Sequence, residues 1–171
     1  MKALLVIDML RDFMSPDGAL YCGDESRKII PFIKRKIDEF HERGDLVVFL
    51  RDAHKPDDLE FRIFGRHAVK GSEGGRIIDE MPVGPRDPVV DKTRFSAFYA
   101  TDLDRVLKEG HPDEVHVTGV CTSICVMDTV GDLRNRDYPV VVYKDGVADF
   151  DPEAHVFALH RMAKTYGAQV I

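Results

Sequence analysis

Three residues far apart in the sequence, Asp8, Lys92 and Cys125, have side chains that could act together on an electrophilic carbon. A cysteine attacks as the thiolate, so it needs a base for its proton and a positive charge beside the sulfur. Asp8 could accept that proton and later deliver it to a leaving group, while Lys92 could stabilise the thiolate or hold Asp8 in place. Each residue alone also fits an ordinary structural role, and only their combination predicts catalysis.

Cys125 lies in the stretch Val117–Val126, where we expect the chain to pass from a strand into a helix. β-branched residues fill Glu114–Thr118, Gly119 breaks the strand, and apolar residues then recur at helical spacing. Unpaired backbone N–H groups and the positive end of the helix dipole lie at such a junction. We therefore expect a lowered pKa for the Cys125 thiol and backbone donors for an oxyanion.

A second group, Asp52, His54 and His67, has the residue types of a metal site. Asp52 and His54 are two positions apart at an expected strand end, so both side chains can face one pocket, and His67 can reach back from the segment that follows. Two imidazoles and a carboxylate leave coordination positions open, as a catalytic divalent metal requires. Glu60 is a further ligand, either directly or through water. The five other histidines are interpreted as solvent-facing or structural: His41, His111, His116, His155 and His160.

Alternating strands and helices must position these residues. Short apolar runs predict strands at Lys2–Ile7, Asp45–Arg51, Pro88–Asp91, Glu114–Thr118, Pro139–Tyr143 and Ala168–Ile171. Apolar periodicity and capping residues predict helices at Ile30–Arg43, at Thr101–Lys108, after Gly119, and from Asp151-Pro152 to Gly167. Proline, glycine and charged residues predict irregular structure for Arg11–Gly23 and Lys55–Arg86.

This alternation predicts an α/β fold with a three-layer arrangement, in which a six-stranded, mainly parallel sheet carries helices on both faces. Ligands of such sheets bind beyond the carboxyl ends of the strands. Each of the first four expected strands ends near one residue of the two groups above. We therefore expect both groups to lie at the same edge of the sheet.

Composition limits the classes of function. A chain of 171 residues suits a single domain spanning residues 1–171. The net charge of −6, without a basic cluster, argues against nucleic acid and against a membrane surface as partners. Three cysteines without a CxxC spacing argue against a disulfide framework, so we expect a cytoplasmic protein that acts on a small molecule. A homo-oligomer is left open.

The sequence resembles the isochorismatase-like cysteine hydrolases, and among them the nicotinamidases. Five segments in family order carry the resemblance: Val6–Phe13, Arg51–His54, Gly65–Gly71, Asp91–Phe98 and Gly119–Val126. The resemblance implies a Rossmann-like topology and a catalytic triad at Cys125, Asp8 and Lys92. It also implies a cis peptide before Cys121, with the backbone amides of Cys121 and Cys125 as the oxyanion hole.

The nicotinamidases add a metal site, which the resemblance puts on Asp52, His54, Glu60 and His67. It implies one divalent ion that binds the pyridine nitrogen, with zinc as the first choice and manganese or iron as alternatives. Aromatic walls of the substrate pocket fall on Phe13, Phe64 and Phe95, whose alternative role is ordinary core packing.

The implied function is hydrolysis of nicotinamide to nicotinate and ammonia through a cysteine thioester, as one step of NAD salvage. The chain departs from many nicotinamidases at Cys121, at Ser123-Ile124 and at Ala68. The alternative is therefore a related hydrolase of another small amide, a ureide or an isochorismate-type substrate, although isochorismate would not need the metal residues. A third hypothesis, a non-catalytic redox sensor using Cys121 and Cys125, leaves Asp8 and Lys92 unexplained.

Overall fold

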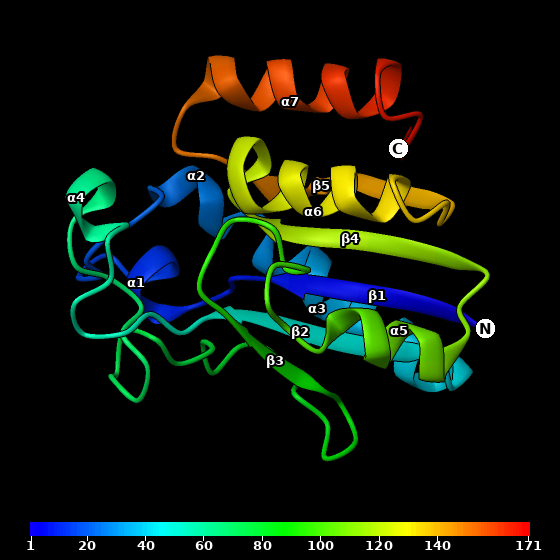
Figure 1. Ribbon diagram of the computed structural model, residues 1–171, viewed down its shortest axis with the longest axis horizontal. Coiled ribbons are helices and arrows are strands. Elements are labelled where there is room, and N and C mark those ends of the chain that lie inside the picture. Colours follow the sequence, from blue (N-terminus) through cyan, green and yellow to red (C-terminus); the bar gives the residue numbers. More distant parts are fainter.

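A computed structural model describes residues 1–171 and contains one six-stranded sheet in the order β3-β2-β1-β4-β5-β6 (Figure 1). Every pair of neighbouring strands is parallel. The strands are β1 (Lys2–Ile7), β2 (Leu46–Asp52), β3 (Val89–Lys92), β4 (Glu114–Val120), β5 (Val140–Ala148) and β6 (Gln169–Val170). The predicted strands are therefore all present, with bounds shifted by a few residues.

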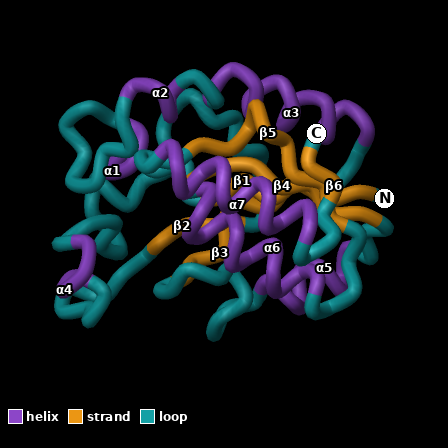
Figure 2. Tube along the Cα trace, turned by 90° about the horizontal axis from the view of Figure 1, so that it is seen from above, coloured by secondary structure: helices purple, strands orange, loops and turns teal.

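Helices cover both faces of the sheet (Figure 2). One face carries α3 (Ile30–Arg43), whose Ile33, Ile37 and Phe40 are buried in one of two apolar clusters. The second cluster lies under α5 (Leu103–Gly110), α6 (Met127–Arg134) and α7 (Pro152–Lys164) on the opposite face. The three-layer α/β prediction is confirmed. None of the helices is both long and apolar enough to cross a membrane.

Local sequence signals explain where the long helices begin and end. Pro31 occupies the first turn of α3, and Gly44 ends that helix with φ of 69°, a left-handed conformation that suits glycine. The Asp151 side chain accepts hydrogen bonds from the N–H groups of Glu153 and Ala154 at the start of α7. Helix α5 starts two residues later than predicted, although Thr101 still accepts the Leu103 N–H through its hydroxyl.

Three short helices lie in segments that were predicted to be irregular or left unassigned, and two of those predictions were wrong in part. They are α1 (Arg11–Met14), α2 (Asp24–Arg27) and α4 (Phe61–Phe64). Helices this short have little stability of their own, so local propensity does not reveal them. Burial of Phe13 and Met14 stabilises α1 instead. In Figure 1 these helices lie beyond the end of β1 that is opposite the N-terminus.

The link from β4 into α6 also differs from the expected simple helix start. Thr122–Val126 forms a π-helical turn, η1, before α6 begins. Gly119, with φ of 115°, lies so close to β1 that a Cβ atom there would be 2.0 Å from the Ile7 carbonyl oxygen. Glycine is therefore required at this close approach of two backbones.

Candidate active site

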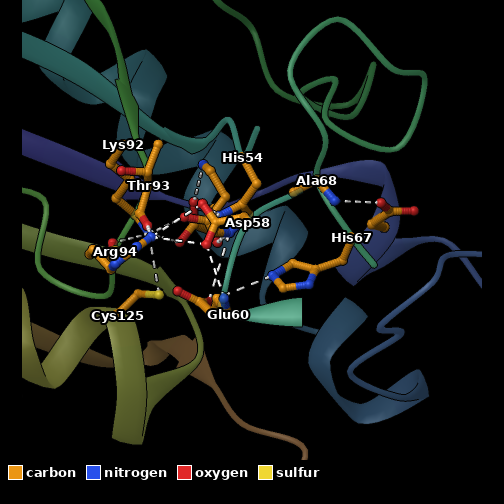
Figure 3. Close-up of polar contacts among 12 residues, drawn as sticks. His54, Asp58, Glu60, His67, Ala68, Lys92, Thr93, Arg94 and Cys125 are labelled. Carbon is orange, nitrogen blue, oxygen red and sulfur yellow. Dashed lines mark hydrogen bonds and ion pairs between the residues drawn. The ribbon is translucent and has the colours of Figure 1, made fainter. Parts of the chain in front are cut away.

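Lys92, at the end of β3, is the centre of a buried charged cluster. Its Nζ atom lies 2.8 Å from Asp8 Oδ2 and 2.6 Å from Asp52 Oδ1. The same atom lies 3.3 Å from Cys125 Sγ, as Figure 3 shows. Lys92 as a whole is only 1% exposed. Residues at or just beyond the ends of four different strands therefore meet at the Lys92 ammonium group.

Strand register explains why these groups meet. Asp52 of β2 is paired with Lys92 of β3, so the two strands end side by side. Asp8 follows β1 and accepts the Asp52 backbone N–H through Oδ1 at 2.8 Å. Its own N–H donates to the Leu50 carbonyl at 2.9 Å, and its φ of 52° lies in the left-handed region. These bonds hold Asp8 in an unusual backbone conformation that aims its carboxylate at Lys92.

The two carboxylates of this cluster differ in acidity. Burial and the neighbouring charge of Asp52 raise the pKa of Asp8 to about 6, although Lys92 acts in the opposite direction. Burial tends to raise the pKa of Asp52 as well, but the contacts of Asp52 with Lys92 and His54 outweigh burial and lower this pKa. The two carboxylates outweigh burial at Lys92 and raise the pKa of that ammonium group. Asp8 can therefore gain or lose a proton near neutral pH, while Lys92 stays charged.

Cys125 lies in η1, next to this cluster, and its side chain is buried. Its sulfur and carboxylate oxygens of Asp8 and Asp52 all lie within 4.8 Å of one another. Burial raises the pKa of the Cys125 thiol well above its usual value, and Lys92 offsets this only in part. The expected lowering of this pKa was therefore wrong, because burial outweighs the favourable charge. The thiol keeps its proton at rest and needs a base during attack.

Asp149, which the sequence analysis did not single out, and His155, which it interpreted as solvent-facing or structural, hold the turn around Cys125. The Ser123 N–H donates to Asp149 Oδ2 at 2.7 Å, and Thr122 Oγ1 lies 2.9 Å from His155 Nδ1. The peptide bond between Val120 and Cys121 is cis, as the resemblance implied. The assignment of the oxyanion hole to backbone amides of this turn stays a prediction.

Asp52, His54 and His67 converge as predicted for a metal site. Their candidate ligand atoms all lie within 4.8 Å of one another, and all three residues are buried. Glu60 is adjacent, with its Oε1 atom 3.8 Å from Nε2 of both histidines. Figure 3 shows Glu60 and His67 turned toward one another. One carboxylate and two imidazoles, with a second carboxylate beside them, suit a divalent transition metal.

The hydrogen bonds of the two histidines test this fit. His67 Nδ1 lies 2.8 Å from the Gly65 carbonyl, which can only accept, so Nδ1 carries the proton and Nε2 keeps its lone pair. His54 Nδ1 is 3.2 Å from the Asp58 carboxylate, and its buried Nε2 has no hydrogen-bond partner. Both Nε2 atoms thus offer lone pairs to the same space. The residues therefore fit a metal ion.

Asp58, which the sequence analysis did not single out, contacts His54 and Glu60 of this group. Besides His54, its carboxylate accepts the Glu60 N–H at 3.0 Å and the Arg94 guanidinium at 3.1 Å (Figure 3). Such outer partners orient metal ligands and set their tautomers. Asp58 lies four residues after His54, but only the folded loop reveals its contact with Arg94.

Members of both groups line one mainly apolar cavity of about 440 Å³. Phe13, Phe64 and Phe95 all line it, as predicted, and the Phe64 and Phe95 rings meet edge to face at 6.1 Å. Asp8, Asp52, Glu60, His67 and Cys125 supply its polar wall. Further lining residues were not predicted: Leu20, Tyr21, Cys22, Ile63, Val120, Ile124 and Phe150. The cavity suits a small ligand with one apolar, flat part.

Comparison with known proteins decides the family. The family description "Isochorismatase domain" matches residues 2–171. The chain belongs to the isochorismatase family. Within this family it is 41% identical to PncA of Bacillus subtilis, which is described as an uncharacterized isochorismatase family protein, over 99% of this chain and 98% of the relative.

Solved structures of isochorismatase-family relatives agree. A crystal structure named as nicotinamidase PncA from Bacillus subtilis has a TM-score of 0.92 at 38% identity, covering 99% of this chain and 98% of the other. Pyrazinamidase of Pyrococcus horikoshii in complex with zinc has a TM-score of 0.93 at 32% identity, with the same coverage. N-carbamoylsarcosine amidase from Thermoplasma acidophilum has a TM-score of 0.90 at 36% identity, covering 99% and 94%.

Proposed function

We propose that this isochorismatase-family protein is a metal-dependent nicotinamidase, which hydrolyses nicotinamide to nicotinate and ammonia as a step of NAD salvage. One observation supports this most strongly: Asp8 and Cys125 of the buried cysteine–aspartate–lysine cluster line the same apolar cavity as Asp52 and His67 of the two-histidine, one-carboxylate donor set. The first group can cleave an amide, and the second can bind a ligand atom such as a pyridine nitrogen. The names of the Bacillus and Pyrococcus relatives point the same way.

The proposed reaction proceeds through a thioester on Cys125. The Cys125 sulfur forms a bond to the carboxamide carbon, and its proton passes to Asp8. Asp8 then gives that proton to the amide nitrogen as the C–N bond breaks, so ammonia leaves. Water next loses a proton to Asp8 and attacks the thioester. The C–S bond breaks, nicotinate is released, and Cys125 recovers its proton.

The surrounding residues supply charge and orientation. Lys92 contacts both Asp8 and Cys125 and would stabilise the negative charge as it moves between them. The backbone amides of Cys121 and Cys125 would bind the oxyanion of each tetrahedral intermediate. Phe13, Phe64 and Phe95 would hold the ring so that its carboxamide meets the sulfur.

Asp52, His54 and His67, with Glu60 directly or through water, would hold one divalent ion. When bound, such an ion supplies Lewis-acid contact to the pyridine nitrogen and so fixes the ring. Zinc is our first choice because the Pyrococcus relative is described in complex with zinc, and manganese and iron are the alternatives. Asp58 and Gly65 prepare the two imidazoles for it, because they fix the Nδ1 protons.

Another small amide or ureide is the second candidate. Two observations favour it: the Thermoplasma relative is named for N-carbamoylsarcosine, and Ile124, a position at which the chain departs from many nicotinamidases, lines the cavity. The polar cluster around Lys92 would perform the same chemistry on either substrate.

Ammonia release by the purified protein separates the candidates. We expect nicotinamide to be hydrolysed, and we expect a chelator to abolish this activity and added zinc, manganese or iron to restore it. Cys125→Ala is the matched control for contaminating amidase activity. Robust release from N-carbamoylsarcosine without release from nicotinamide would favour the second candidate. Absence of release from either would contradict the proposal.

A further inference from the structure

A second pair of reactive groups lies in the cavity wall and has no part in the proposed reaction. The sulfur atoms of Cys22 and Cys121 are 3.5 Å apart, although 99 residues separate them in the sequence. Both thiols are free, and both residues line the cavity. Cys22 is 5% exposed and Cys121 is half-buried, so a small molecule that enters the cavity meets both sulfurs.

Hydrogen bonds hold the Cys22 backbone in place. Its N–H donates to the Phe13 carbonyl at 2.9 Å, and its carbonyl accepts the hydroxyl of the fully buried Ser26 at 2.7 Å. This segment leads from α1 into α2, so the fold itself brings Cys22 against the end of β4.

The Cys121 backbone is fixed equally well. Its carbonyl accepts the N–H groups of Ile124 at 3.1 Å and of Val126 at 3.2 Å at the start of η1. Both α-carbons of the pair are thus held by bonds to their own elements. The two thiols are in contact in the folded chain, so no unfolding is needed for them to react.

We propose that Cys22 and Cys121 form a dithiol modification site, which peroxides convert reversibly to a disulfide within the cavity wall. A disulfide needs a sulfur–sulfur distance of about 2.05 Å, so the two sulfurs must approach by roughly 1.5 Å. Side-chain rotation and small loop shifts can supply this. The site differs from the Cys121–Cys125 pair considered from the sequence, because the structure puts Cys125 against Lys92 instead.

The chemistry balances with hydrogen peroxide as the oxidant. The sulfur of one thiolate attacks a peroxide oxygen, the O–O bond breaks, and protonation gives a sulfenic acid and water. The second thiol then attacks that sulfur, the S–O bond breaks, and a second water leaves as the disulfide forms. Two thiols are oxidised by two electrons and one peroxide is reduced. The contact with Cys22 and burial raise the pKa of the Cys121 thiol, so the reaction should accelerate with rising pH.

The disulfide would also change the cavity. Cys121 carries one of the proposed oxyanion amides, and a shift of its side chain toward Cys22 would disturb that amide and the wall beside it. This effect on ligand binding rests on the proposed function, whereas formation of the disulfide does not.

The test uses the full-length Cys125→Ala protein, in which Cys22 and Cys121 are the only remaining cysteines. After exposure to hydrogen peroxide, we expect the intact mass to fall by two hydrogens and both thiols to disappear from a titration in denaturant. Peptide mapping should find Cys22 linked to Cys121, and dithiothreitol should reverse the change. Cys22→Ser and Cys121→Ser in the same background are matched controls that should not lose two hydrogens. Thermal unfolding checks that each variant is folded.

Two outcomes would overturn the proposal: oxygen added to each thiol without a cross-link, or a disulfide only between two molecules. Calorimetry with nicotinamide tests the effect on the cavity, and we expect binding to the oxidised Cys125→Ala protein to be at least about tenfold weaker than to the reduced protein. A reduced protein that binds no nicotinamide contradicts the proposed function and leaves the disulfide result standing.

Discussion

Asp8 and Asp52 lie at the ends of adjacent strands, joined by a 2.8 Å hydrogen bond from the Asp52 backbone to the Asp8 carboxylate and bridged by Lys92. The two carboxylates share the single positive charge of Lys92, so this charge cannot fully neutralise both of them. Asp52 keeps its charge, and the pKa of Asp8 rises to about 6. This asymmetry suits Asp8 to the proposed role of proton carrier and Asp52 to the proposed role of an anionic metal ligand.

Removal of the Asp8 charge should abolish most turnover. We expect Asp8→Asn to lower kcat by about 10²- to 10⁴-fold, because the amide keeps the shape but cannot carry the proton. Asp17→Asn, on an exposed carboxylate, is the matched control and should keep the parental rate. A near-normal kcat for Asp8→Asn in the ammonia assay would eliminate the proposed role.

The pH dependence should report the same group. Asp8 must be charged to accept the thiol proton, and its raised pKa means that it becomes protonated as the pH falls through about 6. We therefore expect kcat/KM to rise with pH on an acidic limb centred near 6. A limb near 4, the ordinary range for an aspartate, would show that another carboxylate controls the rate.

The two cysteines near the π-helical turn should behave differently. Cys125→Ala should remove turnover and leave the fold intact, because the nucleophile is lost. Cys121→Ala should retain much of the activity, since only its backbone amide is proposed to act. Ammonia release and thermal unfolding of both variants provide the measurement. The reverse pattern, an inactive Cys121→Ala and an active Cys125→Ala, would exchange the two roles.

Loss of a metal ligand should affect binding more than folding. Asp52→Ala and His67→Ala should each release the bound ion, measured by elemental analysis, and raise KM sharply. Cys125 should still react with a small alkylating agent in the His67→Ala protein. His160→Ala, on an exposed histidine, is the control and should keep its ion. Purified parental protein without metal, and with turnover indifferent to chelators, would contradict the metal site.

Replacement of Asp58 tests whether the hydrogen-bond partner of a proposed metal ligand affects metal binding. Asp58→Ala removes the partner of His54 Nδ1, so the imidazole loses its fixed orientation. We expect metal affinity to fall by about 10- to 100-fold, with Cys125 still open to alkylation. Arg94→Gln should cause a smaller loss, because Arg94 acts through Asp58. Unchanged metal affinity of a folded Asp58→Ala protein would show that His54 is held by other contacts.

The residues at the strand ends were predictable because parallel strands bring their carboxyl ends to one edge whatever the loops do. Asp8, Asp52 and Lys92 were found on that basis, and the resemblance added the family roles. Short helices such as α1 were not predictable, because burial in the finished fold stabilises them. The acidity of Cys125 was misjudged for a related reason, since the degree of burial emerges only from packing.

Other features depended on loops whose paths the sequence does not define. The contact between Asp58 and Arg94 joins two loops that follow different strands. The approach of Cys22 to Cys121 likewise depends on how the segment after β1 returns to the sheet. No periodicity or spacing marks either pair.

Because Gly119 has no side chain, β4 can approach β1 closely enough to set the distance between Asp8 and Cys125. A Cβ atom there would meet the Ile7 carbonyl, which comes immediately before the proposed general base Asp8, and Gly119 itself comes shortly before the proposed nucleophile Cys125. The distance between the two proposed reacting groups is thus set by the contact between the backbones of Gly119 and Ile7. Replacements around the cavity can alter which molecule is admitted without changing that separation. In this architecture, selectivity and reactivity can therefore diverge independently during evolution.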